Sequence, residues 1–354
     1  MAKEKTSTTK GISQKIYKAK DFIVGLNYKE LYDKCRLHAQ AFYKDVRFKL
    51  NDLNNTNYEL AVYHYNQGNL SDARFRFWFY SVFWHDRPEV NYFSGRLYFE
   101  GGDFVKATSA IEKYIASGNT TYIQEANYSL KAAKGEVADI HEVPLTIIKH
   151  NYDTLAKKYN DIYLKEPQLS PQYKLCNALN AHLNEVGKPF GNRLLDLGCG
   201  TGIIGKTLKE FKVAGHVTGV ELSPKMSEIA VTLKNDNMPT YNQVLNISIE
   251  DFFSSSAGKN FDLVVGSDTL SNFYDSGKFL EQTTNVCAAN AVLGLLFKTN
   301  EGTENCTFKA LTEEFLHSPT VINDHLKQLG WKIISEENIE FFDLSKGKCI
   351  ICSR

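Results

Sequence analysis

The sequence predicts two folds in one chain: an all-α helical-repeat region, then an α/β region with a Rossmann-like sheet. Residues 21–135 read as consecutive helices, because no glycine-bounded run of β-branched residues interrupts them. After about residue 190, short apolar runs alternate with helical patterns, which is typical of an α/β sheet. The expected parts are a flexible basic tail (1–20), a helical-repeat domain (21–138) and an α/β domain (147–354).

Composition limits the expected partners and location. The 41 basic residues are balanced by 41 acidic residues, so the overall charge does not favour a nucleic acid partner. No apolar run is long enough to span a bilayer, and the N-terminus lacks the apolar core of a secretory signal. We therefore expect a cytoplasmic protein without a membrane span. The Lys/Ser/Thr-rich tail is expected to be solvated, with an organelle transit peptide as the alternative.

The seven cysteines do not suggest a disulfide framework, because their number is odd and their positions are scattered. Cys349 and Cys352 have the C-x-x-C spacing, but no second ligand pair for zinc stands nearby. On a strand, residues three apart point to opposite faces of the sheet. We therefore expect both thiols to be buried and structural, and we predict no metal site.

An internal repeat organises the helical region. The segments YNQGNLSDA (65–73) and FEGGDFVKA (99–107) align at a spacing of 34 residues. This period resembles the tetratricopeptide repeat, a helix-turn-helix unit that buries its apolar face only by stacking. We expect a degraded first repeat around Ala39 and Tyr43, and a capping helix over 121–134. The aligned pairs are Gly68 and Gly102, Leu70 and Phe104, Ala73 and Ala107, Phe77 and Ile111, and Tyr80 and Tyr114.

An aromatic run, FRFWFYSVFWHD (75–86), lies in the second helix of the first clear repeat. Its apolar residues recur at helical spacing, so we predict that this stripe packs in the core. Further aromatic residues widen it beyond one face, which leaves a peptide or domain interface as the alternative. The stripe consists of Phe75, Trp78, Phe79, Val82 and Phe83, and the residues that widen it are Phe77, Tyr80 and Trp84.

Gly135 and Pro144 break the helical pattern and place a domain boundary between residues 135 and 146. Beyond it, apolar residues at steps of three and four predict an amphipathic helix over 148–162, and a further helix is expected over 171–186. The segments RLLDLGCG and HVTGVELS then read as strands on either side of a helix that opens with TGIIGKTLKEF. This β-α-β unit begins the predicted sheet.

The loop after the first strand has the spacing G-x-G-x-x-G, with Gly200, Gly202 and Gly205. That spacing alone is a weak sign of a dinucleotide, whose pyrophosphate would lie at the helix N-terminus. Asp196 argues against this ligand, because a carboxylate close to a pyrophosphate repels it. A cation without phosphate, such as the sulfonium S-adenosylmethionine, suits the loop better.

Here the sequence resembles the class I S-adenosylmethionine-dependent methyltransferases, whose first motif is matched by LLDLGCGTG (194–202). The resemblance runs from about residue 148 to the end and implies a seven-stranded Rossmann-like sheet with an antiparallel last strand. FDLVVGSDTLSNFYD (261–275) and AVLGLLFKTN (291–300) match the fourth and fifth strands, and the last helix with its strand pair follows. The segment NYDTLAKKYNDIY matches a pattern that lies over the cofactor in many members.

The resemblance also implies cofactor-binding residues. The acid at the end of the second strand, Glu221, would hold the ribose hydroxyls, and the following residues, including Ser223, would line the adenine side. After the third strand the adenine contact is left open between Ser248 and the acids Glu250 and Asp251, for which helix capping is the alternative. The implied set is Tyr152, Tyr159, Asp196, Gly198, Cys199, Gly200, Gly202, Glu221, Leu222, Met226, Ser248, Ile249 and Ser267.

Asp268 is the candidate general base, with helix capping or loop ordering as its alternative role. Many members of the resembled family carry a histidine where this chain has Asn272, which cannot act as a base at neutral pH. His150 and His317 are alternative bases, but we expect both to be surface residues because nothing places them near the methyl group. The segment SDTL lacks the Pro-Pro-aromatic motif of members that methylate adenine N6 or glutamine amides, which disfavours that class.

Three functional hypotheses follow. The leading one is methyl transfer from S-adenosylmethionine to a protein substrate recruited by the N-terminal repeats. The second is methyl transfer to a small acid, quinone or phenol-like acceptor, with repeats that dimerise or cover the pocket. The third is an interaction or assembly protein that retains the fold without turnover, motivated by Ser248 and Asn272, which replace common family residues.

Overall fold

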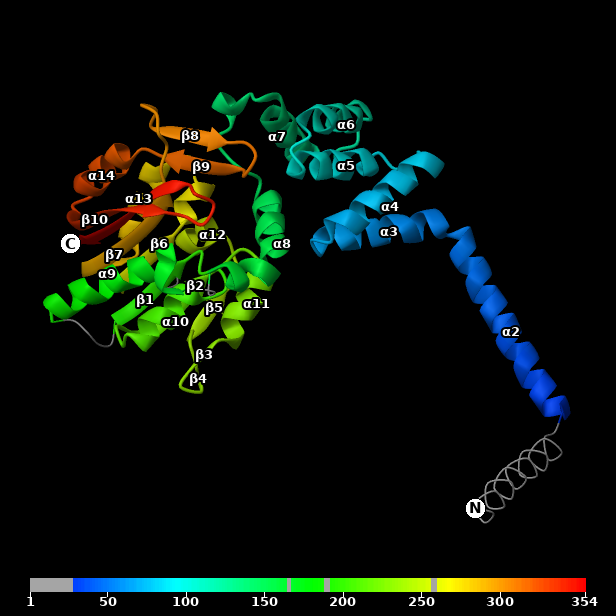
Figure 1. Ribbon diagram of the computed structural model, residues 1–354, viewed down its shortest axis with the longest axis horizontal. Helices are drawn as coiled ribbons and strands as arrows, with labels where there is room; N and C mark the ends of the chain where they lie inside the picture. The colour runs from blue at the N-terminus through cyan, green and yellow to red at the C-terminus, as the bar shows by residue number, and fades with distance from the viewer. Residues whose placement is uncertain (1–27, 164–166, 188–191, 256–259) are drawn as a thin grey trace, which may run out of the picture. The chain divides into compact units, whose positions relative to one another are not determined.

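The computed structural model describes residues 28–163, 167–187, 192–255 and 260–354 (Figure 1). Its contacts divide the chain into two compact units, residues 1–59 and 60–354. In the first unit, α2 (Tyr28–Asn51) is a continuous helix, and α3 (Leu53–Asn66) begins. Ala39 and Tyr43 are exposed on α2, so they are not the buried positions that a degraded first repeat requires.

The second unit begins with stacked helices that repeat as the 34-residue spacing predicts. Gly68 and Gly102 both adopt left-handed backbone conformations, with φ of +74° and +76°, which glycine reaches without strain. The aligned apolar positions Ala73, Phe77, Tyr80, Ala107, Ile111 and Tyr114 are all buried. Helical repeats are thus present, and their tetratricopeptide identity stays a prediction. The helices are α4 (Leu70–Phe83), α5 (Glu89–Glu100), α6 (Phe104–Ala116) and α7 (Ile123–Lys134).

The core prediction for the aromatic stripe on α4 is wrong. The buried face of this helix carries Ala73, Phe77 and Tyr80 instead, and Phe77 stacks on Phe93 of α5 with ring centroids 5.0 Å apart. Helical spacing shows that residues share a face, but not which face meets the neighbouring helix. The stripe residues Phe75, Trp78, Val82 and Phe83 are between 50% and 61% exposed, and Phe79 is half-buried.

A seven-stranded sheet forms the rest of the second unit, in the order β10-β11-β7-β6-β1-β2-β5. The five strands from β7 to β5 pair in parallel, whereas β11 is antiparallel to both β7 and β10. This confirms the predicted Rossmann-like sheet, including its antiparallel last strand. The strands are β1 (Asn192–Leu197), β2 (Ala214–Val220), β5 (Gln243–Leu245), β6 (Phe261–Ser267), β7 (Cys287–Lys298), β10 (Lys332–Glu340) and β11 (Lys346–Ser353).

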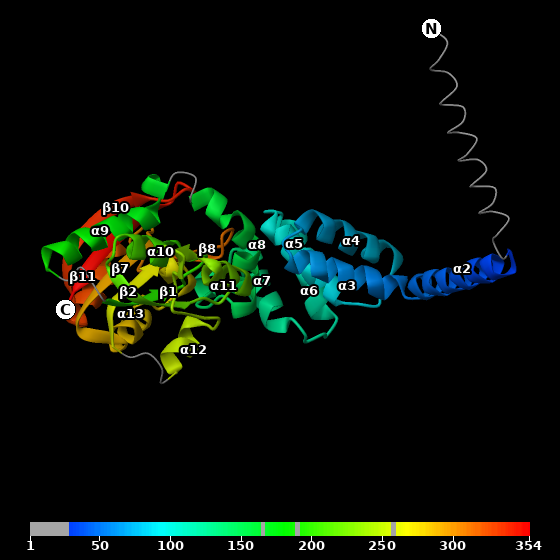
Figure 2. The ribbon, with the colours of Figure 1, turned by 90° about the horizontal axis from the view of Figure 1, so that it is seen from below.

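Helices cover both faces of this sheet, with α9 on one side and α12 and α13 on the other (Figure 2). Successive strand residues point to opposite faces. Leu194 accordingly packs in the core beneath α9 and α10, and Leu195 packs in the core beneath α12 to α14. The helices are α8 (Leu145–Tyr163), α9 (Pro171–Glu185), α10 (Ile203–Glu210), α11 (Pro224–Thr232), α12 (Ile249–Ser254), α13 (Ser276–Asn285) and α14 (Pro319–Gln328).

Cys349 and Cys352 show the same alternation. Both are buried free thiols on β11, and they belong to the cores on opposite faces of the sheet. Their burial is as predicted. Within the described ranges, no helix combines the length and apolar character needed to cross a membrane.

Short elements connect the main ones. The 3-10 helices are η1 (Val137–Asp139), η2 (Pro167–Leu169) and η3 (Thr269–Asn272). One small hairpin is formed by β3 (Lys234–Asn235) and β4 (Met238–Pro239). A second, formed by β8 (Cys306–Lys309) and β9 (Glu314–His317), lies between β7 and α14 in the chain and was not predicted from the sequence.

Candidate active site

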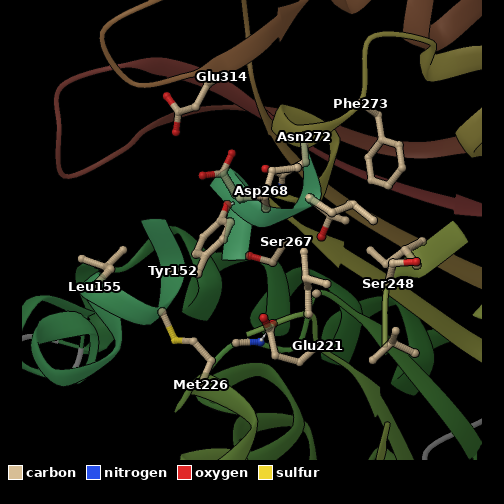
Figure 3. Close-up of a pocket in the computed structure, with 18 of the residues that line it drawn as sticks. Tyr152, Leu155, Glu221, Met226, Ser248, Ser267, Asp268, Asn272, Phe273 and Glu314 are labelled. Carbon is tan, nitrogen blue, oxygen red and sulfur yellow. Dashed lines mark hydrogen bonds between the residues drawn. The ribbon is translucent and has the colours of Figure 1, made fainter. Parts of the chain in front are cut away.

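A cavity of about 220 Å³ lies at the carboxyl ends of the parallel strands (Figure 3). Residues that follow β2, β5 and β6 line it together with the last residue of β7, while α8 contributes Tyr152, Leu155 and Tyr159. Ligands of open α/β sheets bind at this edge, where the strand ends meet. The sequence-predicted residues that line the cavity are Tyr152, Tyr159, Gly198, Gly200, Glu221, Leu222, Met226, Ser248, Ile249, Ser267 and Asp268.

The glycine loop brings bare backbone to this cavity. Gly200 has φ of +54°, and a Cβ built on it would have no atom within 4 Å. Its backbone therefore faces open space where a ligand can approach closely. Gly205 serves packing instead, because a Cβ there would lie 2.5 Å from the Tyr241 hydroxyl.

Asp196 does not line the cavity, which corrects the expectation that its carboxylate faces the ligand. The residue is fully buried beneath the loop, and its Oδ2 accepts a hydrogen bond of 2.6 Å from the Tyr241 hydroxyl. Burial raises the pKa of Asp196 to about 7. Asp196 thus supports the loop through Tyr241. Cys199 and Gly202, also predicted to bind the cofactor, likewise lie outside the cavity lining.

Glu221 lines the cavity and also braces the glycine loop. Its Oε2 accepts a 2.8 Å hydrogen bond from the Gly200 backbone N–H, and its Oε1 accepts one of 2.7 Å from the Ser223 N–H. The carboxyl is 6% exposed, and burial raises its pKa. Ser223 caps α11, and its hydroxyl donates a hydrogen bond to Asp153 of α8. These contacts tie the loop, α11 and α8 together around one end of the cavity.

The structure places the three candidates for the adenine contact, Ser248, Glu250 and Asp251, in different positions. Ser248 caps α12, because its hydroxyl oxygen accepts a 3.0 Å hydrogen bond from the Asp251 backbone N–H. Ser248, Ile249 and Glu250 line the cavity, whereas Asp251 is absent from the lining. Asp251 therefore belongs to the first turn of α12, where an acid is favourable.

Three carboxylates surround one lysine at the other end of the cavity. Lys298 ends β7 and is 7% exposed. Its Nζ lies 2.7 Å from Glu314, 3.1 Å from Asp343 and 3.8 Å from Asp268. Burial lowers the pKa of Lys298, but the three carboxylates outweigh it and raise the pKa above its ordinary value. We call Asp268, Glu314 and Asp343 the acidic cluster.

Asp268 is the member of this cluster whose pKa is raised. It lies just past β6 in a left-handed conformation with φ of +58°, and its N–H donates a 2.7 Å hydrogen bond to the Leu296 carbonyl. Burial raises the pKa of Asp268 to about 7, with Glu314 adding to the rise and Lys298 opposing it. Within the described chain, Asp268 Oδ1 and Glu314 Oε2 are buried without a hydrogen-bond partner. Both oxygens can accept from a ligand.

The other candidate acid-base groups lie elsewhere. Asn272 lines the cavity, and its Nδ2 lies 3.3 Å from the Tyr152 hydroxyl. The expectation that the two histidines lie at the surface is wrong. His317 is 1% exposed, with Nε2 3.0 Å from the Leu270 carbonyl, and His150 stacks on Tyr65 with ring centroids 4.0 Å apart. Both are held by packing between elements, and neither lines the cavity.

Lys298, Glu314 and Asp343 were missed by the sequence analysis. A lysine directly after the apolar run AVLGLLF was a usable signal, because a buried cation requires anionic partners. Glu314 and Asp343 gave no comparable signal, since both lie in segments without a motif.

Residues 195–293 match the protein family described as methyltransferase domain. The matched segment runs from β1 into β7 and includes the glycine loop. This match, together with the strand order, confirms the predicted fold, enzyme class and cofactor, an S-adenosylmethionine-dependent methyltransferase. No curated protein matches the sequence.

Solved structures similar to this chain are distant in sequence. Magnesium protoporphyrin IX methyltransferase from Synechocystis PCC 6803 with bound S-adenosylmethionine is 17% identical, covers 59% of this chain and 96% of its own, and has a TM-score of 0.46. An S-adenosylmethionine-dependent methyltransferase from Leishmania major is 16% identical, with coverages of 59% and 82% and a TM-score of 0.47. The 1,6-didemethyltoxoflavin-N1-methyltransferase from Burkholderia thailandensis is 12% identical, with coverages of 59% and 88% and a TM-score of 0.45.

Proposed function

We propose that the domain binds S-adenosylmethionine at the Glu221 end of the cavity and transfers its methyl group to an amine nitrogen of a small molecule. The acceptor would bind at the acidic cluster. One observation carries this proposal: Asp268 Oδ1 and Glu314 Oε2, both buried and unpaired in the described structure, lie at one end of the cavity whose other end has bare glycine backbone.

The residues of the Glu221 end fit the cofactor. Gly200 leaves open space beside its backbone, and Glu221 offers carboxylate oxygens to ribose hydroxyls. Leu222, Met226 and Ile249 supply apolar surface for an adenine ring. The bound cofactor supplies an activated methyl group on a sulfonium. The protein's task is then to place a nucleophile in line with that methyl carbon and to exclude competing water.

The charge of the acidic cluster selects the acceptor class. Lys298 is already paired with the three carboxylates, so the cluster keeps excess negative charge for a cation or a hydrogen-bond donor. An anionic acid would be repelled, which disfavours the acid acceptors of the second hypothesis. An amine fits, because its N–H groups can donate to Asp268 and Glu314. The neutral amine's lone pair forms the new bond to the methyl carbon, and the electrons of the broken carbon–sulfur bond stay on the departing thioether. A proton of the methylated ammonium then passes to Asp268.

The packing of the repeats favours a small acceptor over a peptide. One face of the helical stack rests on the chain's own α/β domain: Tyr65 stacks on His150, and Tyr128 contacts Phe308 with centroids 6.2 Å apart. A peptide cannot occupy a face that is already covered. We therefore propose that the helices carrying Tyr65 and Tyr128 act as a structural support for the 147–354 domain.

A protein substrate is the second candidate, and one observation favours it. The exposed aromatic stripe on α4 is a surface that a protein could contact. The repeats would then recruit through this outer stripe and not through the covered face.

Methyl-labelled cofactor separates these functions. The full-length protein is incubated with it and a cell lysate, and products are divided into low-mass basic, low-mass acidic and protein fractions. Label in the basic fraction supports the proposal, and label only in protein supports the second candidate. Cofactor binding without any transfer would support the non-catalytic hypothesis. The variant Glu221→Ala is the negative control for transfer.

A further inference from the structure

The β8–β9 hairpin points two neighbouring acids into different environments. Glu314 begins β9 and reaches Lys298 and the cavity. Glu313, one residue earlier, is 6% exposed and points instead toward the helical stack. Its φ of +57° is a left-handed conformation that a residue with a side chain rarely adopts. Such a conformation persists only where surrounding contacts hold it.

Two helices supply the contacts to Glu313, and a third helix holds its arginine partner. The Arg96 guanidinium of α5 donates two hydrogen bonds to the Glu313 carboxylate, of 2.7 Å and 2.9 Å. Asn151 of α8 donates a third, of 2.9 Å, and Arg96 also donates to the Ser129 hydroxyl of α7 at 3.2 Å. A paired, two-bond arrangement fixes the orientation of both side chains, not only their distance.

Because this ion pair is buried, each partner depends on the other for compensation of its charge. Arg96 is fully buried, and the Glu313 side chain is 4% exposed, so water cannot replace either partner. Removing one partner leaves a buried charge without compensation, which forces the local structure to rearrange. The hairpin is the element that can move, because Glu313 lies in its turn.

We propose that Arg96 is a positioning residue for the acceptor end of the active site. Through Glu313 it fixes the hairpin turn, and thereby holds Glu314 at 2.7 Å from Lys298 within the acidic cluster. The helical repeats thus complete a catalytic pocket that the α/β domain does not finish alone. The effect on the acceptor rests on the proposed function, whereas the effect on the hairpin does not depend on it.

Hydrogen exchange of the full-length variant Arg96→Gln tests the positioning. Amides of the hairpin, residues 306–317, are expected to exchange about tenfold faster or more, while those of β1 and β2 keep their rates. Calorimetry with S-adenosylmethionine should show an affinity within about twofold of the wild type. The matched control is Arg36→Gln, which alters an exposed arginine of α2 and should change neither quantity.

Two further variants separate positioning from general stability. Arg96→Lys keeps the charge but loses the planar pair of donors, so hairpin exchange should fall between that of Arg96→Gln and the wild type. Glu314→Gln should raise KM for the amine acceptor found by labelling without loosening the hairpin. Unchanged hairpin exchange in Arg96→Gln, or equal loosening of β1, β2 and the hairpin, would overturn the proposal. Failure of the wild type to bind S-adenosylmethionine would instead refute the proposed function and leave the exchange result standing.

Discussion

The two ends of the cavity are built in different ways. The Glu221 end uses backbone, apolar side chains and the Glu221 carboxylate, most of them from the continuous stretch 194–226. The acidic cluster uses charged side chains that follow β6, begin β9 and lie between β10 and β11, grouped around the last residue of β7. A short motif can therefore encode the part that fits a common cofactor. The part that selects an acceptor depends on long-range folding.

The carboxylates at the two ends also differ in how they are satisfied. Glu221 accepts hydrogen bonds from two backbone N–H groups, whereas Asp268 Oδ1 has no partner within the described residues. A satisfied carboxylate keeps its geometry, and an unsatisfied one is available to a ligand. This contrast predicts that the first carboxylate controls binding and the second controls chemistry.

The largest expected effect is that of Asp268→Asn, which removes the proton acceptor. We expect kcat for the amine acceptor to fall by about 100- to 10,000-fold, with cofactor affinity nearly unchanged. Because the carboxyl must be ionised to accept a proton, wild-type kcat should rise with pH through about 7 and then level off. The variant should lose that rise. Asp324→Asn, on the exposed side of α14, is the control, and a fully active Asp268→Asn would contradict the assignment.

Glu221→Ala should have the next largest effect, on binding instead of chemistry. Loss of the carboxylate removes the ribose contact and frees the Gly200 and Ser223 N–H groups from their acceptor. We expect cofactor affinity to fall about 100-fold, equivalent to about 3 kcal/mol. Titration calorimetry measures it, with exposed Glu228→Ala on α11 as the control. If both variants bind equally well, the cofactor does not use this end of the cavity.

Asp196→Asn should affect the cofactor least, because the residue lies outside the cavity lining. We expect less than about a threefold change in affinity, since no direct contact is lost. Asp196→Asn should instead change the pH dependence of the free energy of unfolding. The folded pKa of about 7 exceeds the ordinary value of 3.8, so the group's contribution to stability is complete below pH 3.8 and is lost as pH rises through 7.

Denaturant titrations at several pH values would measure that contribution. For Asp196 it amounts to roughly 4 kcal/mol across this pH range, and Asp196→Asn should remove this pH dependence. An unaltered pH profile of the unfolding free energy in the variant would show that the carboxyl is ionised at neutral pH. A large loss of cofactor affinity would restore the sequence-based view that Asp196 faces the ligand.

The cofactor end could be predicted from sequence because its information is local. Strand, glycine loop and helix follow one another, and Glu221 comes directly after β2. Asp196 was misplaced because its partner Tyr241 is 45 residues away. Strand alternation places Asp196 and Leu195 on opposite faces of the sheet, but nothing in the motif tells which ligand or side chain Asp196 meets.

The acidic cluster could not be predicted because its members come together only in the folded chain. Glu314 reaches Lys298 only through the β8–β9 hairpin, which carries no recognisable motif. In the helical region the repeat alignment was the better guide, since it matched Phe77 with Ile111 and Tyr80 with Tyr114, the pairs that are buried. Helical spacing alone predicted that the aromatic stripe on α4 would be buried, and most of the stripe is exposed.

The ion pair between Arg96 and Glu313 has a practical consequence for dividing the protein. A fragment that starts at residue 145 would present the Glu313 carboxylate and the Phe308 ring to solvent, and the complementary fragment would present Arg96 and Tyr128. Each fragment would thus expose an aromatic ring and a charged side chain that has lost its ion-pair partner. Expression trials that seek the catalytic half by truncation should therefore yield aggregates, whereas co-expression of both halves should recover a soluble complex.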